Sequence, residues 1–412
     1  MSKDITILGS GIIGTMSAYF ALKQNYSVTL VEKNSSAGLG SSFQNGGQLS
    51  FSHIFSVCDI NIFKYIIKNC LTNNTPITIN YLEAIKNLDW CVNFLKNSKK
   101  TPKHYDDLFA LAHKSHIAFN EILTDVPNLN LDKRGSIQIF RQESSFKKVQ
   151  NLINLFDKYK INHRVISGNE VRDFVPEYIS GNNRSIYFPD DMCGNAYELI
   201  INMIEYMKLN PNFTYLTNQN IKNIVINNGK IRSLITDKTE ISSDKYIVTP
   251  GSYVEDLNSC LNVDIPIKPL KGYSFNHHKL KLSKCLIDHD SKIVYTPLKD
   301  YTRVSGLYDF TGFNSDLNKK RIKFMQRNMQ TLIKADHDIS NFSDIWCGFR
   351  PLTSDKFPLI GNSNQYQNLY YNIGHANLGF TLSSGSSQTL INSLEKGEDI
   401  IPKSFHAKRF NI

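Results

Sequence analysis

The N-terminal sequence reads Ile5-Thr6-Ile7-Leu8, a short uncharged apolar run, and continues as Gly9-Ser10-Gly11-Ile12-Ile13-Gly14, which fits the pattern G-x-G-x-x-G. Apolar residues at helical spacing follow over 15–22, and a β-branched run over 28–31 leads to Glu32 and Lys33. This order is typical of a βαβ unit that binds a dinucleotide: a strand, a glycine turn, a helix and a second strand that ends in an acid. We therefore expect a dinucleotide cofactor at this turn.

Each glycine of the turn has a different predicted role. Gly9 permits the tight turn, Gly11 lets the backbone approach a pyrophosphate without a Cβ in the way, and Gly14 brings the helix close to the strand. The helix N-terminus adds unpaired N–H groups and the positive end of the helix dipole. Glu32 stands eighteen residues after Gly14, where its carboxylate can accept hydrogen bonds from a ribose diol.

The sequence after this unit favours FAD over NAD. It continues with Gly38, Ser41-Ser42 and Asn45-Gly46-Gly47-Gln48. This stretch resembles the amino-acid-oxidising flavoproteins of the D-amino-acid oxidase and glycine oxidase superfamily, in which a glycine-bearing loop after the second strand passes beside the flavin. The alternative interpretation is a surface loop that is rich in glycine by chance.

Length and composition indicate a globular protein with room for two domains. The chain has 412 residues, of which 41% are hydrophobic and 20% are charged, and these values are ordinary for soluble proteins. The net charge of +10 would suit nucleic acid or an anionic membrane, but the basic residues are dispersed and we expect no nucleic-acid binding. Because the sequence shows neither a signal peptide nor a transmembrane stretch, we expect a cytoplasmic protein, with the inner face of the membrane as an alternative location.

Cysteine and histidine patterns give no indication of a metal site. Seven cysteines stand singly and none forms C-x-x-C. An odd number of cysteines without a secretion signal indicates free thiols. The eleven histidines include no H-E-x-x-H motif, and so we expect no metal.

Periodicity predicts helices and strands along the rest of the chain. The expected helices lie at 83–96, 108–123, 146–159, 196–207, 319–334 and 380–394. The expected strands lie at 135–140, 186–188, 213–216, 246–249, 266–273, 293–295, 303–306 and 369–373, with an antiparallel meander over 221–243. The apolar stretch from 51 to about 82, with interspersed lysines, predicts either a helix that faces the core or a patch that touches a membrane.

The C-terminal sequence makes the resemblance specific. Residues 348–353 read Gly-Phe-Arg-Pro-Leu-Thr, and residues 374–379 read Gly-His-Ala-Asn-Leu-Gly. Together with the loop at 45–48 and Pro-Leu-Lys-Gly-Tyr-Ser at 269–274, they resemble, nearly end to end, the small subunit of the bacterial D-amino-acid dehydrogenases. Two positions depart from that family: Asn25 replaces a helix-ending glycine, which asparagine can do in the left-handed conformation, and Ala376 stands where the family usually repeats glycine.

The resemblance implies an α/β fold with two interleaved domains. One is a Rossmann-like FAD-binding βαβ domain of the glutathione-reductase type, as in D-amino-acid oxidase, with expected bounds at 1–88, 190–262 and 345–412. The other is an α+β substrate domain on a mostly antiparallel sheet, with expected bounds at 89–189 and 263–344.

The resemblance also implies a site. Arg350 is expected to hold the substrate carboxylate, because a guanidinium binds carboxylates bidentately, and Tyr273 could donate a hydrogen bond to the same group. The turn 374–379 is expected to aim backbone N–H groups at the negative charge of reduced flavin. The residues expected to bind FAD are Ile7, Leu8, Gly9, Ser10, Gly11, Ile12, Ile13, Gly14, Glu32, Lys33, Ser41, Ser42, Asn45, Gly46, Gly47, Gln48, Gly251, Gly348, Gly374, His375, Leu378 and Gly379.

The implied reaction is the oxidative deamination of D-amino acids such as D-alanine, by hydride transfer from Cα to flavin N5, to a 2-oxo acid and ammonia. The expected electron acceptor is a quinone or another component of the respiratory chain, with a possible peripheral contact to the membrane. The alternatives are a glycine or sarcosine oxidase that uses O2, a dehydrogenase of another amine, and a flavin-binding protein without amine oxidation.

Overall fold

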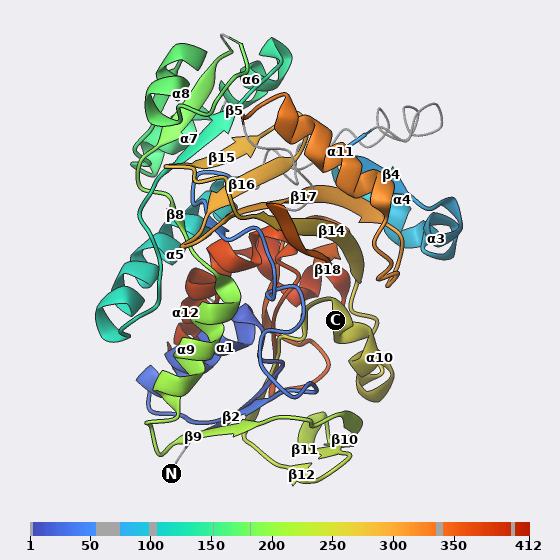
Figure 1. Cartoon of the computed structure of the whole chain (residues 1–412). Coiled ribbons are helices and arrows are strands. Elements are labelled where there is room, and N and C mark those ends of the chain that lie inside the picture. Colours follow the sequence, from blue (N-terminus) through green and yellow to red (C-terminus); the bar gives the residue numbers. More distant parts are fainter. Residues whose placement is uncertain are drawn as a thin grey trace.

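The computed structural model describes residues 3–54, 75–98, 105–150, 152–181, 183–334, 341–396 and 400–412 (Figure 1). Most of the predicted apolar stretch 51–82 therefore lies outside the described residues, and its described part includes a short strand at 77–79, where a helix was one of the two expectations. In Figure 1 the βαβ unit lies in the lower half of the molecule and a large second sheet lies in the upper half. Helices fill the space between them.

Six strands form the sheet that carries the glycine turn, in the order β19-β20-β13-β1-β2-β9 within the described residues. Their bounds are β1 (Asp4–Leu8), β2 (Ser27–Val31), β9 (Phe213–Leu216), β13 (Lys245–Val248), β19 (Leu359–Asn362) and β20 (Leu369–Ile373). All neighbours pair parallel except β19, which is antiparallel to β20. Helix α1 (Ile12–Lys23) connects β1 to β2, so the predicted βαβ unit is confirmed. Asn25 adopts a φ of 59° just after this helix, as expected.

The second large sheet has the order β18-β14-β17-β16-β15-β5-β7-β6, with β4 beside β17. Among its described pairs, only β15 with β5 and β17 with β4 are parallel, so the sheet is mostly antiparallel as expected. The strands are β4 (Ile77–Ile79), β5 (Ser136–Ile139), β6 (Arg164–Ile166), β7 (Ser185–Phe188), β14 (Ile267–His277), β15 (Cys285–Asp288), β16 (Ile293–Pro297), β17 (Thr302–Phe310) and β18 (Phe342–Thr353).

Two small sheets complete the strands. β10 (Ile221–Asn227), β11 (Lys230–Thr236) and β12 (Glu240–Ile241) form the predicted antiparallel meander. β3 (Gln48–Leu49) pairs with β8 (Met192–Cys193), which fixes the loop 45–48 against the rest of the chain.

Helix predictions are confirmed for the long segments and corrected for two others. The confirmed helices are α5 (Tyr105–Asp125), α9 (Ala196–Met207), α11 (Lys319–Gln330) and α12 (Gly379–Lys396). The single helix expected at 83–96 is two, α3 (Tyr81–Lys86) and α4 (Leu88–Ser98), and the one expected at 146–159 is α6 (Glu143–Gln150) and α7 (Ile153–Lys158). The remaining helices are α8 (Gly168–Phe174) and α10 (Glu255–Leu261). No helix among the described residues is long and apolar enough to cross a membrane.

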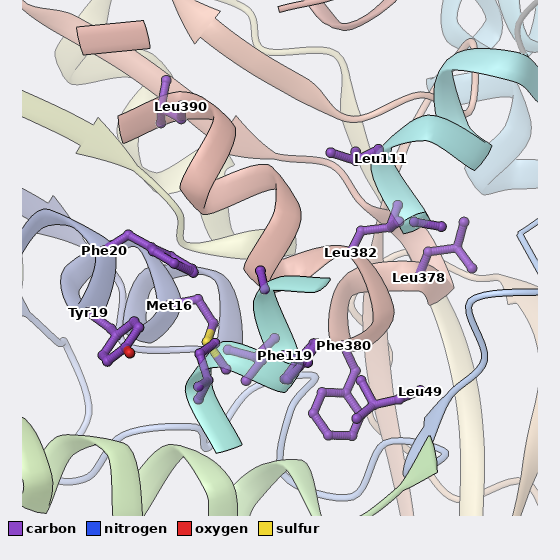
Figure 2. Packing of buried hydrophobic residues seen from close by; sticks show 14 of the residues in the cluster. Met16, Tyr19, Phe20, Leu49, Leu111, Phe119, Leu378, Phe380, Leu382 and Leu390 are labelled. Atoms are coloured by element: carbon purple, nitrogen blue, oxygen red, sulfur yellow. The ribbon is translucent and has the colours of Figure 1, made fainter. Parts of the chain in front are cut away.

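Helix α12 packs between α1 and α5, and Figure 2 shows their apolar side chains meeting. Small residues allow this close approach: a Cβ on Gly385 would lie 2.7 Å from the backbone nitrogen of Ser115 in α5. The Ser384 hydroxyl donates to the Ser115 carbonyl at 3.0 Å, and the hydroxyls of Ser17 and Ser387 lie 3.0 Å apart. Hydrogen bonds thus satisfy the polar groups of the buried serines. Because α1 and α12 pack against each other, the glycine turn before α1 is positioned relative to the start of α12.

Candidate active site

A large cavity is lined by residues of both large sheets. It brings together most of the residues that the sequence predicted. The predicted residues that line it are Leu8, Gly9, Gly11, Ile12, Ile13, Glu32, Lys33, Ser41, Ser42, Asn45, Gly46, Gly47, Gln48, Gly251, Tyr273, Gly348, Arg350, Gly374, His375, Leu378 and Gly379.

Three predicted residues do not line the cavity, and each has a structural contact instead. Ile7 is fully buried in the centre of β1. Ser10 turns toward Glu32, to which it donates two hydrogen bonds. Gly14 packs against the Gly9 carbonyl, which a Cβ at position 14 would overlap. These contacts fix the shape of the turn and of the strand before it.

The glycine turn leaves open space where a phosphate is expected. Gly9 has a φ of 101°, which favours glycine. A Cβ on Gly11 would meet only the Ser42 hydroxyl, at 3.6 Å, so the cavity side of Gly11 is free of backbone. The Ile12 N–H donates to that same hydroxyl at 3.2 Å. Helix N-termini of this kind bind anions.

Glu32 is held firmly at the end of β2. One carboxylate oxygen accepts hydrogen bonds from the backbone N–H and the hydroxyl of Ser10, at 2.9 and 2.7 Å. The other accepts from the backbone N–H and the side-chain amide of Asn34, at 2.9 and 2.7 Å. These bonds occupy the carboxylate's four or so acceptor positions. A ribose hydroxyl would therefore have to replace the Ser10 hydroxyl or the Asn34 amide, and the ribose role of Glu32 stays a prediction.

The loop 45–48 is anchored to the second sheet by residues that sequence reasoning missed. Arg303 of β17 is buried, and its Nη1 donates to the Asn45 carbonyl at 3.3 Å. The Thr296 hydroxyl donates to the Gly46 carbonyl at 2.5 Å. A Cβ on Gly46 would lie 2.9 Å from the Ser305 hydroxyl and 3.3 Å from a Val294 methyl, so a side chain at position 46 would displace both groups. Strand alternation alone could not single out these side chains in the sequence.

Arg350 lies on β18, with its guanidinium at the cavity. Its Nη1 donates to the Leu307 carbonyl at 2.7 Å, and its Cζ lies 4.8 Å from the centre of the Tyr308 ring. Burial lowers the pKa of the guanidinium from its usual 12.5, although Tyr308 and Asp309 oppose that shift. No carboxylate within the described part of the chain forms an ion pair with Arg350. A desolvated cation of this kind is stabilised when an anion binds beside it.

Gly272 of β14 makes room for that guanidinium. A Cβ at position 272 would overlap Nη1, Cζ and Nη2 of Arg350. The backbone φ of Gly272 is not in the left-handed region, so the glycine is required by the guanidinium and not by the backbone. Gly272 lies within the stretch 269–274 that carries the family resemblance, but the sequence alone indicated no role for it.

Tyr273 is bonded to a different group from Arg350. Its hydroxyl donates to the Asp309 carboxylate at 2.9 Å, and Asp309 forms a buried ion pair of 2.6 Å with Arg321 of α11. Tyr273 thus packs with the core under α11, and only part of it borders the cavity. Tyr308, which sequence reasoning missed, places a phenol ring directly against the Arg350 guanidinium and lines the cavity.

Two histidines, His53 and His289, also line the cavity. The rings of His53 and His289 lie 4.7 Å apart, edge to face. Burial lowers the pKa of His53 to about 3, with a further lowering from Lys292. Nε2 of His289 lies 3.0 Å from the Gln138 side-chain oxygen. Both imidazoles are therefore neutral near pH 7. Across the described ranges, no three His, Cys, Asp or Glu side chains come together as a metal-binding group.

The family described as FAD dependent oxidoreductase matches residues 4–392. This chain belongs to that family. The match covers every segment that lines the cavity of this FAD dependent oxidoreductase.

Relatives and solved structures agree with the family. This oxidoreductase is 27% identical over 394 residues to a D-amino acid dehydrogenase from Vibrio vulnificus, covering 93% of this chain and 94% of that protein. Its fold is similar to glycine oxidase from Bacillus cereus, with a TM-score of 0.75, 19% identity and coverage of 97% and 96%. L-proline dehydrogenase from P. horikoshii gives a TM-score of 0.79 at 16% identity, with coverage of 99% and 98%.

The residues of the cavity fit FAD. His375 is buried, and among the described residues neither of its ring nitrogens has a hydrogen-bond partner. Burial lowers the pKa of His375 to about 3, so its ring is neutral near pH 7 and can both donate and accept. Buried polar atoms without partners are costly, and a polar cofactor can satisfy them. Ala376, next to His375, has a φ of 50°, so the turn keeps its left-handed backbone despite the missing glycine.

Proposed function

We propose that this oxidoreductase is an FAD-dependent D-amino-acid dehydrogenase. The observation that carries the proposal is the Arg350 guanidinium, which borders the cavity and lacks a carboxylate partner within the described residues. Substrates with a carboxylate would supply that partner. The match over nearly the whole chain to a protein named D-amino acid dehydrogenase supports the class of substrate.

Arg350 and Tyr308 would together bind the substrate carboxylate. Nη1 of Arg350 is held by the Leu307 carbonyl, and Gly272 leaves the space that the guanidinium fills. The Tyr308 ring packs against the guanidinium, which puts a phenol hydroxyl near the same anion. We therefore assign to Tyr308 the role that the sequence suggested for Tyr273, whose hydroxyl is bonded to Asp309.

This arrangement fixes one end of the substrate, so that its Cα–H bond has one orientation. When bound, FAD supplies the two-electron oxidation by accepting the hydride. If the amine binds uncharged, no side chain has to remove a proton first. The neutral rings of His53, His289 and His375 do not add positive charge that would repel an ammonium group. The imino acid product then reacts with water to give the 2-oxo acid and ammonia.

The electron acceptor distinguishes the proposed dehydrogenase from the main alternative, an oxidase. We propose a quinone-type acceptor at the cytoplasmic face of the membrane, in line with the dehydrogenase relative. A glycine or sarcosine type of oxidase would use O2, and the likeness to glycine oxidase concerns the fold. Substrate consumption with and without a quinone analogue, together with a peroxide assay, separates the two. Equal rates of peroxide formation and substrate loss would show an oxidase.

We call Arg350 and Tyr308 together the carboxylate clamp, and replacing Arg350 tests it. Arg350→Leu should keep FAD and the fold but lose amino-acid oxidation, because truncating one partner of a buried charge pair costs about 2–5 kcal/mol. That corresponds to roughly thirtyfold to several thousandfold in binding or rate. Arg350→Lys should recover only part, because a point charge cannot make the two-pronged contact.

The assay is anaerobic bleaching of the bound flavin with a panel of D- and L-amino acids. Amines without a carboxylate serve as the matched control, because wild type and Arg350→Leu should oxidise them equally poorly. If Arg350→Leu bleaches with D-alanine at the wild-type rate and half-saturation, Arg350 does not bind the substrate.

A further inference from the structure

Two flat side chains lie across a pair of glycines in the wall of the cavity. Gly272 of β14 and Gly348 of β18 are paired directly across the two strands, and both line the cavity. A Cβ on Gly272 would lie 2.3 Å from Nη1 of Arg350, and a Cβ on Gly348 would lie 2.0 Å from Cη2 of Trp346. The Arg350 guanidinium therefore covers one glycine and the Trp346 indole covers the other.

The indole and the guanidinium are neighbours on one face of the sheet. Directly paired residues of an antiparallel sheet point to the same face, with their Cβ positions roughly 4.5–5.5 Å apart. Trp346, Gly348 and Arg350 are also alternate residues of β18, and all three line the cavity. Cys347, between the first two, packs instead against the core under α11. The register of the two strands thus places the indole beside the guanidinium.

The indole approaches the guanidinium with an apolar edge. The three atoms nearest to the Cβ position of Gly348 are Cη2, Cζ2 and Cζ3 of Trp346, all carbons of the six-membered ring. The indole therefore extends along β18 in the direction of Arg350. Tyr308, whose ring centre lies 4.8 Å from Cζ of Arg350, belongs to β17 on the other side of β14. The guanidinium consequently lies between a phenol ring and a hydrocarbon edge.

We propose that Trp346 limits the size of the substrate's side chain, so that the site favours D-amino acids with small apolar side chains. This inference rests on the proposed function, in which Arg350 binds the substrate carboxylate. Because Cα is bonded directly to that carboxylate, the substituents of Cα reach the space beside the indole. An apolar ring edge favours an apolar substituent there, whereas an amine would lose its hydrogen bonds.

The indole also has a packing contact, which could explain an aromatic residue at this position without any part in selection. Its ring centre lies 6.3 Å from that of Phe43, which in turn contacts Tyr197 at 5.0 Å. Phe43 is not among the described residues that line the cavity. Loss of packing alone would change the oxidation of all substrates alike. A limit on side-chain size changes the ratio between large and small substrates.

The test is the second-order rate of anaerobic flavin bleaching by D-phenylalanine, divided by the rate for D-alanine, in the full-length, FAD-loaded protein. Trp346→Leu should raise this ratio roughly tenfold or more, because the fit of a substituent in an apolar pocket discriminates by about 10- to 200-fold. Trp346→Phe keeps an aromatic ring and should raise the ratio less. The matched control is Phe43→Leu, which removes a ring that contacts the indole and should leave the ratio at the wild-type value.

Carboxylates that cannot be oxidised test the same limit without turnover. Acetate and 3-phenylpropanoate are titrated against the protein, and the change in flavin absorbance reports their binding. Trp346→Leu should strengthen the binding of 3-phenylpropanoate relative to acetate by roughly tenfold, for the same reason.

An unchanged ratio in Trp346→Leu, or an equal rise in Phe43→Leu, would overturn the role of Trp346. If wild type binds carboxylates but oxidises no D-amino acid, only the proposed function fails, and the carboxylate titration decides the role of Trp346 by itself. If wild type binds neither carboxylate, both conclusions are wrong.

Discussion

Gly272→Ala tests whether the position of the Arg350 guanidinium matters for the reaction, because it adds a single methyl group beside that guanidinium. The backbone of Gly272 is outside the left-handed region, so alanine adds no backbone strain there. Its methyl carbon, however, would overlap three atoms of the Arg350 guanidinium, whereas ordinary contact begins at 3.4 Å. The guanidinium therefore has to move by about an ångström, away from the position that the Leu307 carbonyl fixes.

A displacement of about 1 Å in a positioning group can reduce the rate about a hundredfold, which corresponds to roughly 2.7 kcal/mol. We expect Gly272→Ala to lower kcat/KM for D-alanine by about that factor in an anaerobic stopped-flow assay. FAD occupancy should stay at the wild-type level, because Gly272 borders the cavity on the side of Arg350 and not at the glycine turn.

Gly40→Ala is the matched control. Gly40 also lines the cavity, but a Cβ there would meet its nearest neighbour, Tyr253, at 3.7 Å, which is ordinary contact. This variant should oxidise D-alanine like wild type. If Gly272→Ala keeps the wild-type kcat/KM, the position of the guanidinium does not limit the reaction and our account of the clamp is wrong.

Three further predictions follow from the cavity and the core. Gly11→Val should give folded but colourless protein, because only the Ser42 hydroxyl is near the new Cβ and the side chain enters the cofactor's space; full flavin absorbance would contradict this. His375→Leu should weaken FAD binding about 5- to 150-fold, from roughly 1–3 kcal/mol for an unpaired polar group, measured by flavin fluorescence, and His375→Gln should weaken it less. Burial raises the pKa of the Asp191 carboxyl from 3.8 to about 6, so the folded protein binds a proton more tightly than the unfolded chain does. The contribution of Asp191 to the free energy of unfolding is therefore highest at low pH and falls as the pH rises through 6, by about 3 kcal/mol at most. Asp191→Asn should remove this fall in the free energy of unfolding, measured by denaturant unfolding between pH 4 and 7. If wild type and variant change in parallel with pH, Asp191 is not the group responsible.

The sequence identified the cavity-lining residues of the glycine turn more readily than those around Arg350. The glycine turn works through backbone and local spacing, so G-x-G-x-x-G followed by Glu32 is readable from neighbouring residues. The substrate clamp depends on which face of a strand each side chain occupies. A register shift between Lys271 and Tyr273 in the pairing of β14 with β17, and a φ of 63° at Leu307, break simple alternation. The choice between Tyr273 and Tyr308 therefore could not be made from the sequence.

The division of one expected helix into α3 and α4 has a local cause. Asn87 lies between them with a φ of −118°, and its side-chain amide donates to the Glu83 carbonyl at 2.9 Å. Asparagine competes in this way with the backbone hydrogen bonds of a helix. Hydrophobic periodicity continues across the break, so the pattern predicted one helix. The domain bounds expected from the sequence remain a prediction, although the six strands of the cofactor sheet do come from separate parts of the chain.

The strand order of the cofactor sheet has a consequence for biosynthesis. β1 is made first, yet its neighbour β13 comes more than two hundred residues later, and β20 on the far side of β13 spans Leu369–Ile373. The turn that carries His375 follows β20 directly. A ribosome therefore has to release nearly the entire polypeptide before the cavity can close around FAD. Pairing between such distant segments is slow, so the edge of β1 that pairs with β13 keeps its backbone N–H and C=O groups unpaired while most of the chain is made, and an unpaired strand edge is a site for aggregation.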